Sequence, residues 1–312
     1  MYLQSASSHL STILRFYPAA HQNGSAMSSI RFYPETIDSI PDLVRLESLS
    51  CLYKQDHEGN QIIWRVWGQG LPIVLLHGGS GSWNHWCRNI KTLVGLQRQV
   101  WIPDIPCFGD SDAPTGVLDI DQASDILLTA FSRFFPDQRI DLIGFSMGSI
   151  GAAYIAKKIP DHINRLILVA PPALGISPVE SIVIEDWTTA SDVQLRDQKI
   201  RNNLASLMLW GQSAISDLSL DIHKKNLLKD RMRKRKIYKT DFLMTILKNL
   251  ALPFYCIIGR QDALYRGNLD LVELALGAIQ KNQSLEIIED AGHWVQFEKS
   301  AQFNEIIERI LV

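Results

Sequence analysis

A serine stands between two glycines in the segment Gly144-Phe145-Ser146-Met147-Gly148, which follows an apolar run and precedes a stretch of small residues. We expect a strand over residues 139–143 and a helix over residues 149–158, so the serine would lie at a tight strand-to-helix turn. Glycine is needed at 144 and 148 because a Cβ at either position would crowd the backbone of the turn. The turn would hold the Ser146 hydroxyl at the edge of a sheet, within reach of a histidine.

A serine hydroxyl becomes a good nucleophile only when a base removes its proton, and an acid must orient that base. Asp262 follows the apolar run 254–258, and His293 follows the run 284–289. The carboxyl ends of parallel strands meet at one edge of a sheet, so Ser146, Asp262 and His293 are predicted to form a catalytic triad in that chain order. Either Asp262 or His293 alone would be an ordinary loop residue, and the prediction depends on the set.

Attack by the serine would create an oxyanion, which two backbone N–H groups must stabilise. The N–H of Met147, directly after the serine, is one candidate. The second is expected from the loop His77-Gly78-Gly79-Ser80-Gly81, with Gly79 as the donor and Ser80 as the near alternative. A phosphate-binding loop is disfavoured here because no Gly-Lys-Ser/Thr follows.

The elements that must position these residues alternate along the chain. Strands are expected over residues 62–67, 72–77, 99–103, 139–143, 166–170, 253–259 and 284–289, and helices over 86–96, 122–135, 149–158, 268–280 and 300–312. This alternation predicts an α/β fold with a mainly parallel sheet covered by helices on both faces. The roughly 80 residues between 170 and 253 have helical patterning without a strand, which predicts a helical cap over the carboxyl ends of the strands.

The chain is long enough for one large core with an insertion. We assign residues 46–175 and 241–312 to the core, 176–240 to the cap and 1–45 to a loosely ordered N-terminal extension. The first 26 residues lack the basic and apolar regions of a signal peptide, and Met27 is an alternative start.

Composition narrows the class of protein. Apolar residues make up 46% of the chain, charged residues 21%, and the net charge is −2, so nothing global points to nucleic acid or to an anionic membrane. No apolar run approaches the roughly 20 residues that span a bilayer. Four cysteines show no metal or redox spacing, so we expect reduced thiols, a cytoplasmic location, and neither metal nor cofactor. The expected partner is a small-molecule substrate, and a homo-oligomer is compatible with the sequence.

Over residues 60–312 the chain resembles α/β-hydrolases with a helical cap, and among them the meta-cleavage-product hydrolases, which cut carbon–carbon bonds in ring-opened aromatic compounds. The resemblance rests on the loop 77–81 with Asn89-Ile90 after it, and on the segment 292–298 with Phe303-Asn304 after it. It implies an α/β-hydrolase sheet with the cap inserted after the sixth strand. It also implies that Trp294 lines the pocket, although a core aromatic covering the histidine loop fits the pattern equally well.

Two departures from that family concern the substrate. Phe145 stands where those enzymes usually carry asparagine, and His223 falls close to the position of their cap arginine, which holds the keto-acid end of the substrate. The predicted substrate contacts are therefore Ser80, Phe145, His223 and Trp294.

The basic run 224–239 has six lysines and three arginines against one acid, and is expected to be a solvated helix face, or else to steer a carboxylate substrate. We expect Trp187, Met208 and Trp210 either to line the cap side of the pocket or to pack between the cap and the sheet.

These residues together predict a cofactor-independent serine hydrolase acting on a small carbonyl substrate, either an ester or a vinylogous diketone cut at a carbon–carbon bond. A carboxylesterase, or a lactone or thioester hydrolase, would use the same residues. A non-catalytic small-molecule receptor on the same fold is the alternative from another class. A dehalogenase is disfavoured because its nucleophile would be an aspartate at position 146.

Overall fold

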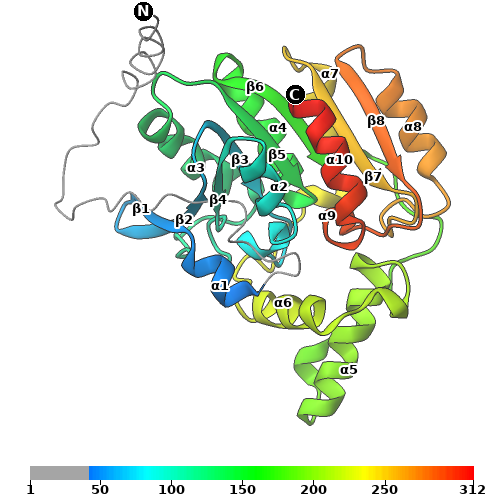
Figure 1. Ribbon diagram of the computed structural model, residues 1–312. Helices are drawn as coiled ribbons and strands as arrows, with labels where there is room; N and C mark the ends of the chain where they lie inside the picture. Colours follow the sequence, from blue (N-terminus) through cyan, green and yellow to red (C-terminus); the bar gives the residue numbers. More distant parts are fainter. Residues whose placement is uncertain (1–41) are drawn as a thin grey trace, which may run out of the picture. The chain divides into compact units, whose positions relative to one another are not determined.

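The computed structural model describes residues 42–312 (Figure 1). Residues 1–41 of the expected extension, with Met27, lie outside the described residues. The extension was predicted to reach residue 45, but Leu43–Ser48 form helix α1. The side chain of Asp42 caps this helix by accepting backbone N–H groups of its first turn.

Eight strands form one sheet in the order β1-β2-β4-β3-β5-β6-β7-β8. The strands are β1 (Cys51–His57), β2 (Asn60–Trp67), β3 (Leu71–Leu76), β4 (Arg98–Pro103), β5 (Ile140–Phe145), β6 (Ile163–Val169), β7 (Phe254–Gly259) and β8 (Asn282–Ile288). β2 pairs antiparallel with β1 and β4, and every other pair is parallel, which confirms the mainly parallel α/β fold. The sequence prediction omitted β1, because this edge strand is largely exposed and shows no apolar alternation.

Helices cover both faces of the sheet (Figure 1). One face packs against α3 (Ile120–Phe134), α4 (Met147–Lys158), α7 (Phe242–Lys248) and α8 (Leu269–Gly277); the other packs against α1, α2 (Ile90–Gly95), α9 (Val295–Glu298) and α10 (Ser300–Leu311). Neighbouring residues of a strand point to opposite faces of the sheet. On β3, Val74 packs into the hydrophobic core on one face and Leu75 into the core on the other. The parallel strands are therefore apolar on both faces, as their continuous apolar runs predicted.

Between β6 and β7 the chain forms helices and no strand. These include α5 (Val193–Asn203), a π-helical turn (Leu204–Met208), α6 (Asp217–Leu228) and α7. The helical insertion after the sixth strand is thus present, with α5 and α6 beyond the end of the sheet and α7 packed into the core (Figure 1). The boundaries 176 and 240 remain predictions.

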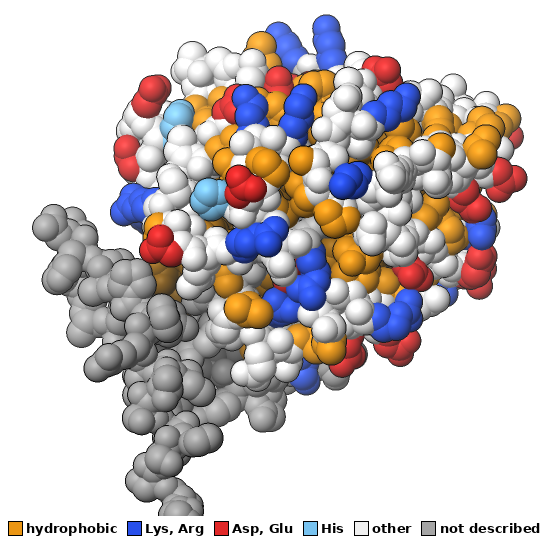
Figure 2. All heavy atoms as spheres, turned by 90° about the horizontal axis from the view of Figure 1, so that it is seen from above, with side chains coloured by type: hydrophobic (Ala, Val, Ile, Leu, Met, Phe, Trp, Pro, Cys, Tyr) orange, Lys and Arg blue, Asp and Glu red, His pale blue; other side chains and the backbone are white. Residues whose placement is uncertain are grey.

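The basic run 224–239 is not one helix face. α6 ends at Leu228, and residues 229–236 form turns and irregular chain. The expectation of a continuous helical face was therefore wrong for its second half. On the face seen in Figure 2, lysine and arginine side chains are interspersed with acidic ones, in keeping with the small net charge. Within residues 42–312, every helix is too short or too polar to cross a bilayer.

Candidate active site

Ser146 lies at the turn from β5 into α4, with φ 51° and ψ −121°. Its N–H donates to the carbonyl of Val169 on β6 at 2.8 Å, which holds the turn on the sheet. A Cβ at Gly144 would lie 2.2 Å from the carbonyl oxygen of Gly148, and a Cβ at Gly148 would lie 2.4 Å from the carbonyl oxygen of His77. Both glycines are therefore required, and α4 begins in direct contact with the end of β3.

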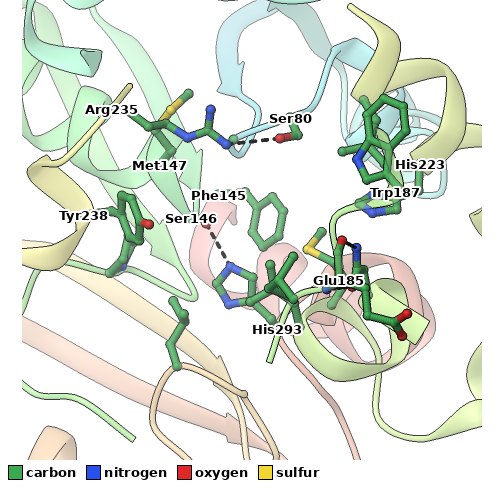
Figure 3. Close-up of a pocket in the computed structure, with 18 of the residues that line it drawn as sticks. Ser80, Phe145, Ser146, Met147, Glu185, Trp187, His223, Arg235, Tyr238 and His293 are labelled. Carbon is green, nitrogen blue, oxygen red and sulfur yellow. Dashed lines mark hydrogen bonds between the residues drawn. The ribbon is translucent and has the colours of Figure 1, made fainter. Parts of the chain in front are cut away.

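The structure brings Ser146, His293 and Asp262 together as a hydrogen-bonded set. Figure 3 shows the hydrogen bond between Ser146 and His293. Nε2 of His293 lies 2.8 Å from Oγ of Ser146, and Nδ1 lies 2.9 and 3.0 Å from the two carboxylate oxygens of Asp262. A carboxylate accepts hydrogen bonds, so Nδ1 carries the proton and Nε2 is left to accept the serine hydroxyl. Asp262 and His293 are buried and Ser146 is half-buried, so Ser146 is the most solvent-accessible of the three residues.

The segments that carry the two predicted oxyanion donors both adjoin the serine. Met147 is the first residue of α4, where backbone N–H groups have no acceptor within the helix and the helix dipole favours negative charge. The loop after β3 approaches from the other side, since a Cβ at Gly78 would lie 3.1 Å from the Cβ of Ser146. Gly79 follows in that loop, and both it and Met147 line the cavity described next.

A cavity of about 550 Å³ opens over Ser146 (Figure 3). Its walls come from the loop after β3, the turn before α4, the histidine loop and the cap. The lining residues are Gly79, Ser80, Asp119, Phe145, Ser146, Met147, Pro172, Ile184, Glu185, Asp186, Trp187, Asn203, Leu207, Met208, His223, Leu227, Arg235, Tyr238, Leu264 and His293. Of the predicted site residues, only Asp262 and Trp294 are absent from this lining. Asp262 lies behind His293, where its orienting contact requires it.

Arg235 is the one lysine or arginine among these lining residues, and sequence reasoning missed it. Its Nη1 lies 2.9 Å from a carboxylate oxygen of Asp230. Its Nη2 donates to Oγ of Ser80 at 3.0 Å, and Figure 3 marks this hydrogen bond. Ser80 in turn donates to the same carboxylate at 2.6 Å. The cap is thus joined to the loop that carries Gly79. In the sequence Arg235 belongs to the basic run 224–239, which predicts a solvated side chain. It reaches the cavity because the chain turns after α6.

His223 lines the cavity but cannot supply charge near neutral pH. It is buried on α6, and burial lowers its pKa from 6.5 to about 4. The ring is therefore neutral at pH 7, where a carboxylate-binding residue would have to be charged. The prediction that His223 takes over the role of a cap arginine needs this correction: the cation in the cavity is Arg235.

Trp294 does not face the cavity. Its side chain is 0% exposed, its Nε1 donates to the carbonyl of His85 at 3.1 Å, and its ring stacks on Phe297 with centroids 4.1 Å apart. The pocket role implied by the family resemblance is therefore wrong here, and the alternative core role is correct. Trp187 and Met208 do line the cavity, whereas Trp210 lies 40% exposed outside it.

No cluster of three or more histidine, cysteine or acidic side chains suited to a metal ion occurs within residues 42–312.

Residues 72–208 match the family model described as alpha/beta hydrolase fold. The 2-hydroxy-6-oxo-6-phenylhexa-2,4-dienoate hydrolase of Burkholderia cepacia is 27% identical over 255 residues, covering 77% of this chain and 87% of that protein. The 2-hydroxy-6-oxononadienedioate/2-hydroxy-6-oxononatrienedioate hydrolase 2 of Pseudomonas putida is 25% identical, covering 84% of this chain and 96% of that protein.

Solved structures share the fold at lower identity. A meta-cleavage product hydrolase from Pseudomonas fluorescens aligns with a TM-score of 0.66 at 20% identity, covering 82% of this chain and 95% of that one. A thermophilic esterase from Thermogutta terrifontis aligns with a TM-score of 0.63 at 19% identity, covering 84% of this chain and 98% of that one. At these identities the likeness concerns the fold alone.

Proposed function

Because this chain is an enzyme of the α/β-hydrolase fold, we propose that it hydrolyses a small carbonyl compound through nucleophilic attack by Ser146, without a cofactor. The observation that carries the proposal is the continuous hydrogen-bonded set at the cavity floor, with His293 2.8 Å from Ser146 and 2.9 Å from Asp262. A histidine held between a serine hydroxyl and a buried carboxylate is the arrangement that activates a serine nucleophile, and it argues against a non-catalytic receptor.

The reaction follows from the geometry. Nε2 of His293 takes the proton of the Ser146 hydroxyl while Oγ attacks the substrate carbonyl, and the N–H groups of Met147 and Gly79 hold the oxyanion. The leaving group receives the proton from His293, which leaves an acyl group on Ser146. Water then gives a proton to His293 and attacks the acyl carbon, releasing a carboxylic acid and restoring the serine. Asp262 keeps the imidazole oriented and stabilises its charged form.

For the substrate we propose a vinylogous diketone that carries a carboxylate, cut at a carbon–carbon bond. The relatives of 25–27% identity that support this are named as hydrolases of 2-hydroxy-6-oxo-dienoates. Arg235, at the Ser80 side of the cavity, is the group that would receive the carboxylate, while Phe145 and Met208 offer apolar walls. His293 would first move a proton to ketonise the dienol, and the ketone next to the scissile bond would then meet Ser146.

A carboxylesterase, or a lactone or thioester hydrolase, is the second candidate, and a specific observation favours it. His223 is neutral at pH 7, and the charge of Arg235 is shared with Asp230 at 2.9 Å. Glu185 and Asp186 also line the cavity. A neutral ester would meet no repulsion from these carboxylates and would use the same nucleophile, base and oxyanion donors.

Measuring kcat/KM on a 2-hydroxy-6-oxo-6-aryl-dienoate and on a short-chain aryl ester, with Ser146→Ala as the blank, separates the candidates. A Ser146-dependent preference for the dienoate supports carbon–carbon cleavage. Ester turnover with the dienoate left intact supports the esterase. Turnover that persists in Ser146→Ala at a tenth of the wild-type rate removes Ser146 as the nucleophile in either case.

A further inference from the structure

Glu298, the last residue of α9, bridges two segments that come from different parts of the chain. One carboxylate oxygen accepts the backbone N–H of Trp210 at 2.9 Å, and the other accepts the backbone N–H of Gly292 at 2.7 Å. Gly292 directly precedes His293, and Trp210 follows the π-helical turn of the cap. The carboxylate therefore ties the histidine loop to the cap insertion.

A second contact holds the other side of the same loop. The N–H of Trp294 donates to the carbonyl of Met208 at 2.7 Å, and a Cβ at Gly292 would lie 2.8 Å from the backbone nitrogen of Trp210. Residues on both sides of His293 are thus pressed against one stretch of cap backbone. The side chain of Met208 lines the cavity, so the cavity wall and His293 share this support.

A carboxylate suits this position better than any neutral side chain. It offers two acceptor oxygens to two N–H groups that point in from separate segments, and hydrogen bonds to an ionised acceptor are roughly twice as strong as neutral ones. A glutamine would keep one acceptor and turn a donor toward the other N–H. Burial raises the pKa of Glu298, whereas its two backbone hydrogen bonds lower it, so the bonds offset part of the cost of burying the charge.

We propose that Glu298 is a positioning residue for His293. It fixes the histidine loop on the cap, so that Nε2 of His293 stays directed at Ser146 and the base moves together with the cavity wall. Glu298 is not among the lining residues and acts only through these backbone contacts. The proposal rests on the proposed function, because it requires His293 to be the base that activates Ser146.

The test compares Glu298→Gln and Glu298→Ala with a control, Glu286→Gln. Glu286 lies on β8 and forms a surface ion pair with Arg309 on α10. Four quantities are measured: kcat and KM on the best substrate, the second-order rate of Ser146 sulfonylation by phenylmethanesulfonyl fluoride, and the thermal midpoint. The sulfonylating reagent is small and neutral, so its rate reports the base and the nucleophile more than the substrate contacts.

We expect kcat of Glu298→Ala to fall about 10- to 100-fold, since a displacement near 1 Å can cost a factor of about 100. The sulfonylation rate should fall in parallel while KM changes less than about threefold, and Glu298→Gln, which keeps one acceptor, should lie between wild type and Glu298→Ala. The control should match wild type. If Glu298→Ala does not fold, the split between kcat and KM in Glu298→Gln decides the question.

Two results overturn the proposal. A lower thermal midpoint with unchanged kcat and sulfonylation rate means that the bridge is only structural. A raised KM with an unchanged sulfonylation rate means that the cap contact acts on substrate binding. Failure of the proposed function looks different, because wild-type Ser146 itself would then resist the reagent while the enzyme stays active on its substrate.

Discussion

Replacing Arg235 by glutamine tests whether the cavity reads substrate charge. A substrate carboxylate seated ~4 Å from the guanidinium would gain about 4 kcal/mol at an effective dielectric constant of about 20. Asp230, whose carboxylate lies 2.9 Å from Arg235, would then sit roughly 7 Å from the substrate and oppose binding by about 2 kcal/mol. The net attraction in the wild-type enzyme is therefore about 2 kcal/mol, which corresponds to about 30-fold in kcat/KM.

The size of the loss depends on what Asp230 does when its partner is gone. If Asp230 stays ionised, the full attraction of about 4 kcal/mol is lost and kcat/KM falls about 1,000-fold; if it takes up a proton, its repulsion also disappears and the loss is about 30-fold. The assay uses an acidic substrate and its neutral methyl ester or amide at one salt concentration. The neutral analogue should lose less than about threefold.

Arg233→Gln is the matched control for this experiment. It removes the same charge two residues away, from a side chain that does not line the cavity. We expect it to leave the acidic and the neutral substrate unchanged. Equal losses on both substrates in Arg235→Gln would refute the reasoning, because Arg235 would then act through Ser80 on the oxyanion loop and not through its charge.

Three further predictions follow from the site. Asp262→Asn should lower kcat by about four orders of magnitude with KM little changed, since the imidazole would adopt the wrong tautomer; a loss below tenfold would remove Asp262 from the set. Gly148→Ala should destabilise the fold by about 1–3 kcal/mol in urea unfolding, because its Cβ would meet the carbonyl of His77 at 2.4 Å, and an unchanged midpoint would contradict the tight turn. His223 has a folded pKa of about 4, below its ordinary 6.5, so its contribution to stability is complete above pH 6.5 and is lost as the pH falls toward 4. Wild type should therefore lose about 2 kcal/mol between pH 7 and pH 5 that His223→Gln does not lose, and parallel pH profiles would contradict the burial argument.

The sequence was most informative where chemistry leaves few structural choices. The glycines around Ser146 are forced by backbone approaches of 2.2 and 2.4 Å, so the pattern itself predicts the turn. The positions of Asp262 and His293 follow from strand polarity, because the carboxyl ends of parallel strands share an edge. Both inferences are local or topological, and neither needs knowledge of side-chain packing.

Predictions failed where packing or burial decides. Arg235 enters the cavity because the chain turns after α6, and helical periodicity carries no information about that turn. His223 lines the cavity, yet its charge depends on a burial that only the folded cap creates. Trp294 sits beside His293 in sequence, but its ring turns into the core to stack on Phe297. β1 was missed because an exposed edge strand needs no apolar alternation.

Covalent trapping of the nucleophile tests the central proposal most directly. The wild-type enzyme is treated with a fluorophosphonate while residual activity and intact mass are followed together, and the modified peptide is then sequenced by mass spectrometry. We predict one adduct per chain on Ser146, formed in step with the loss of activity. Ser146→Ala should form no adduct, and Asp262→Asn should form it more slowly than wild type. Complete inactivation with Ser146 unmodified, or full activity with Ser146 fully modified, would contradict the account.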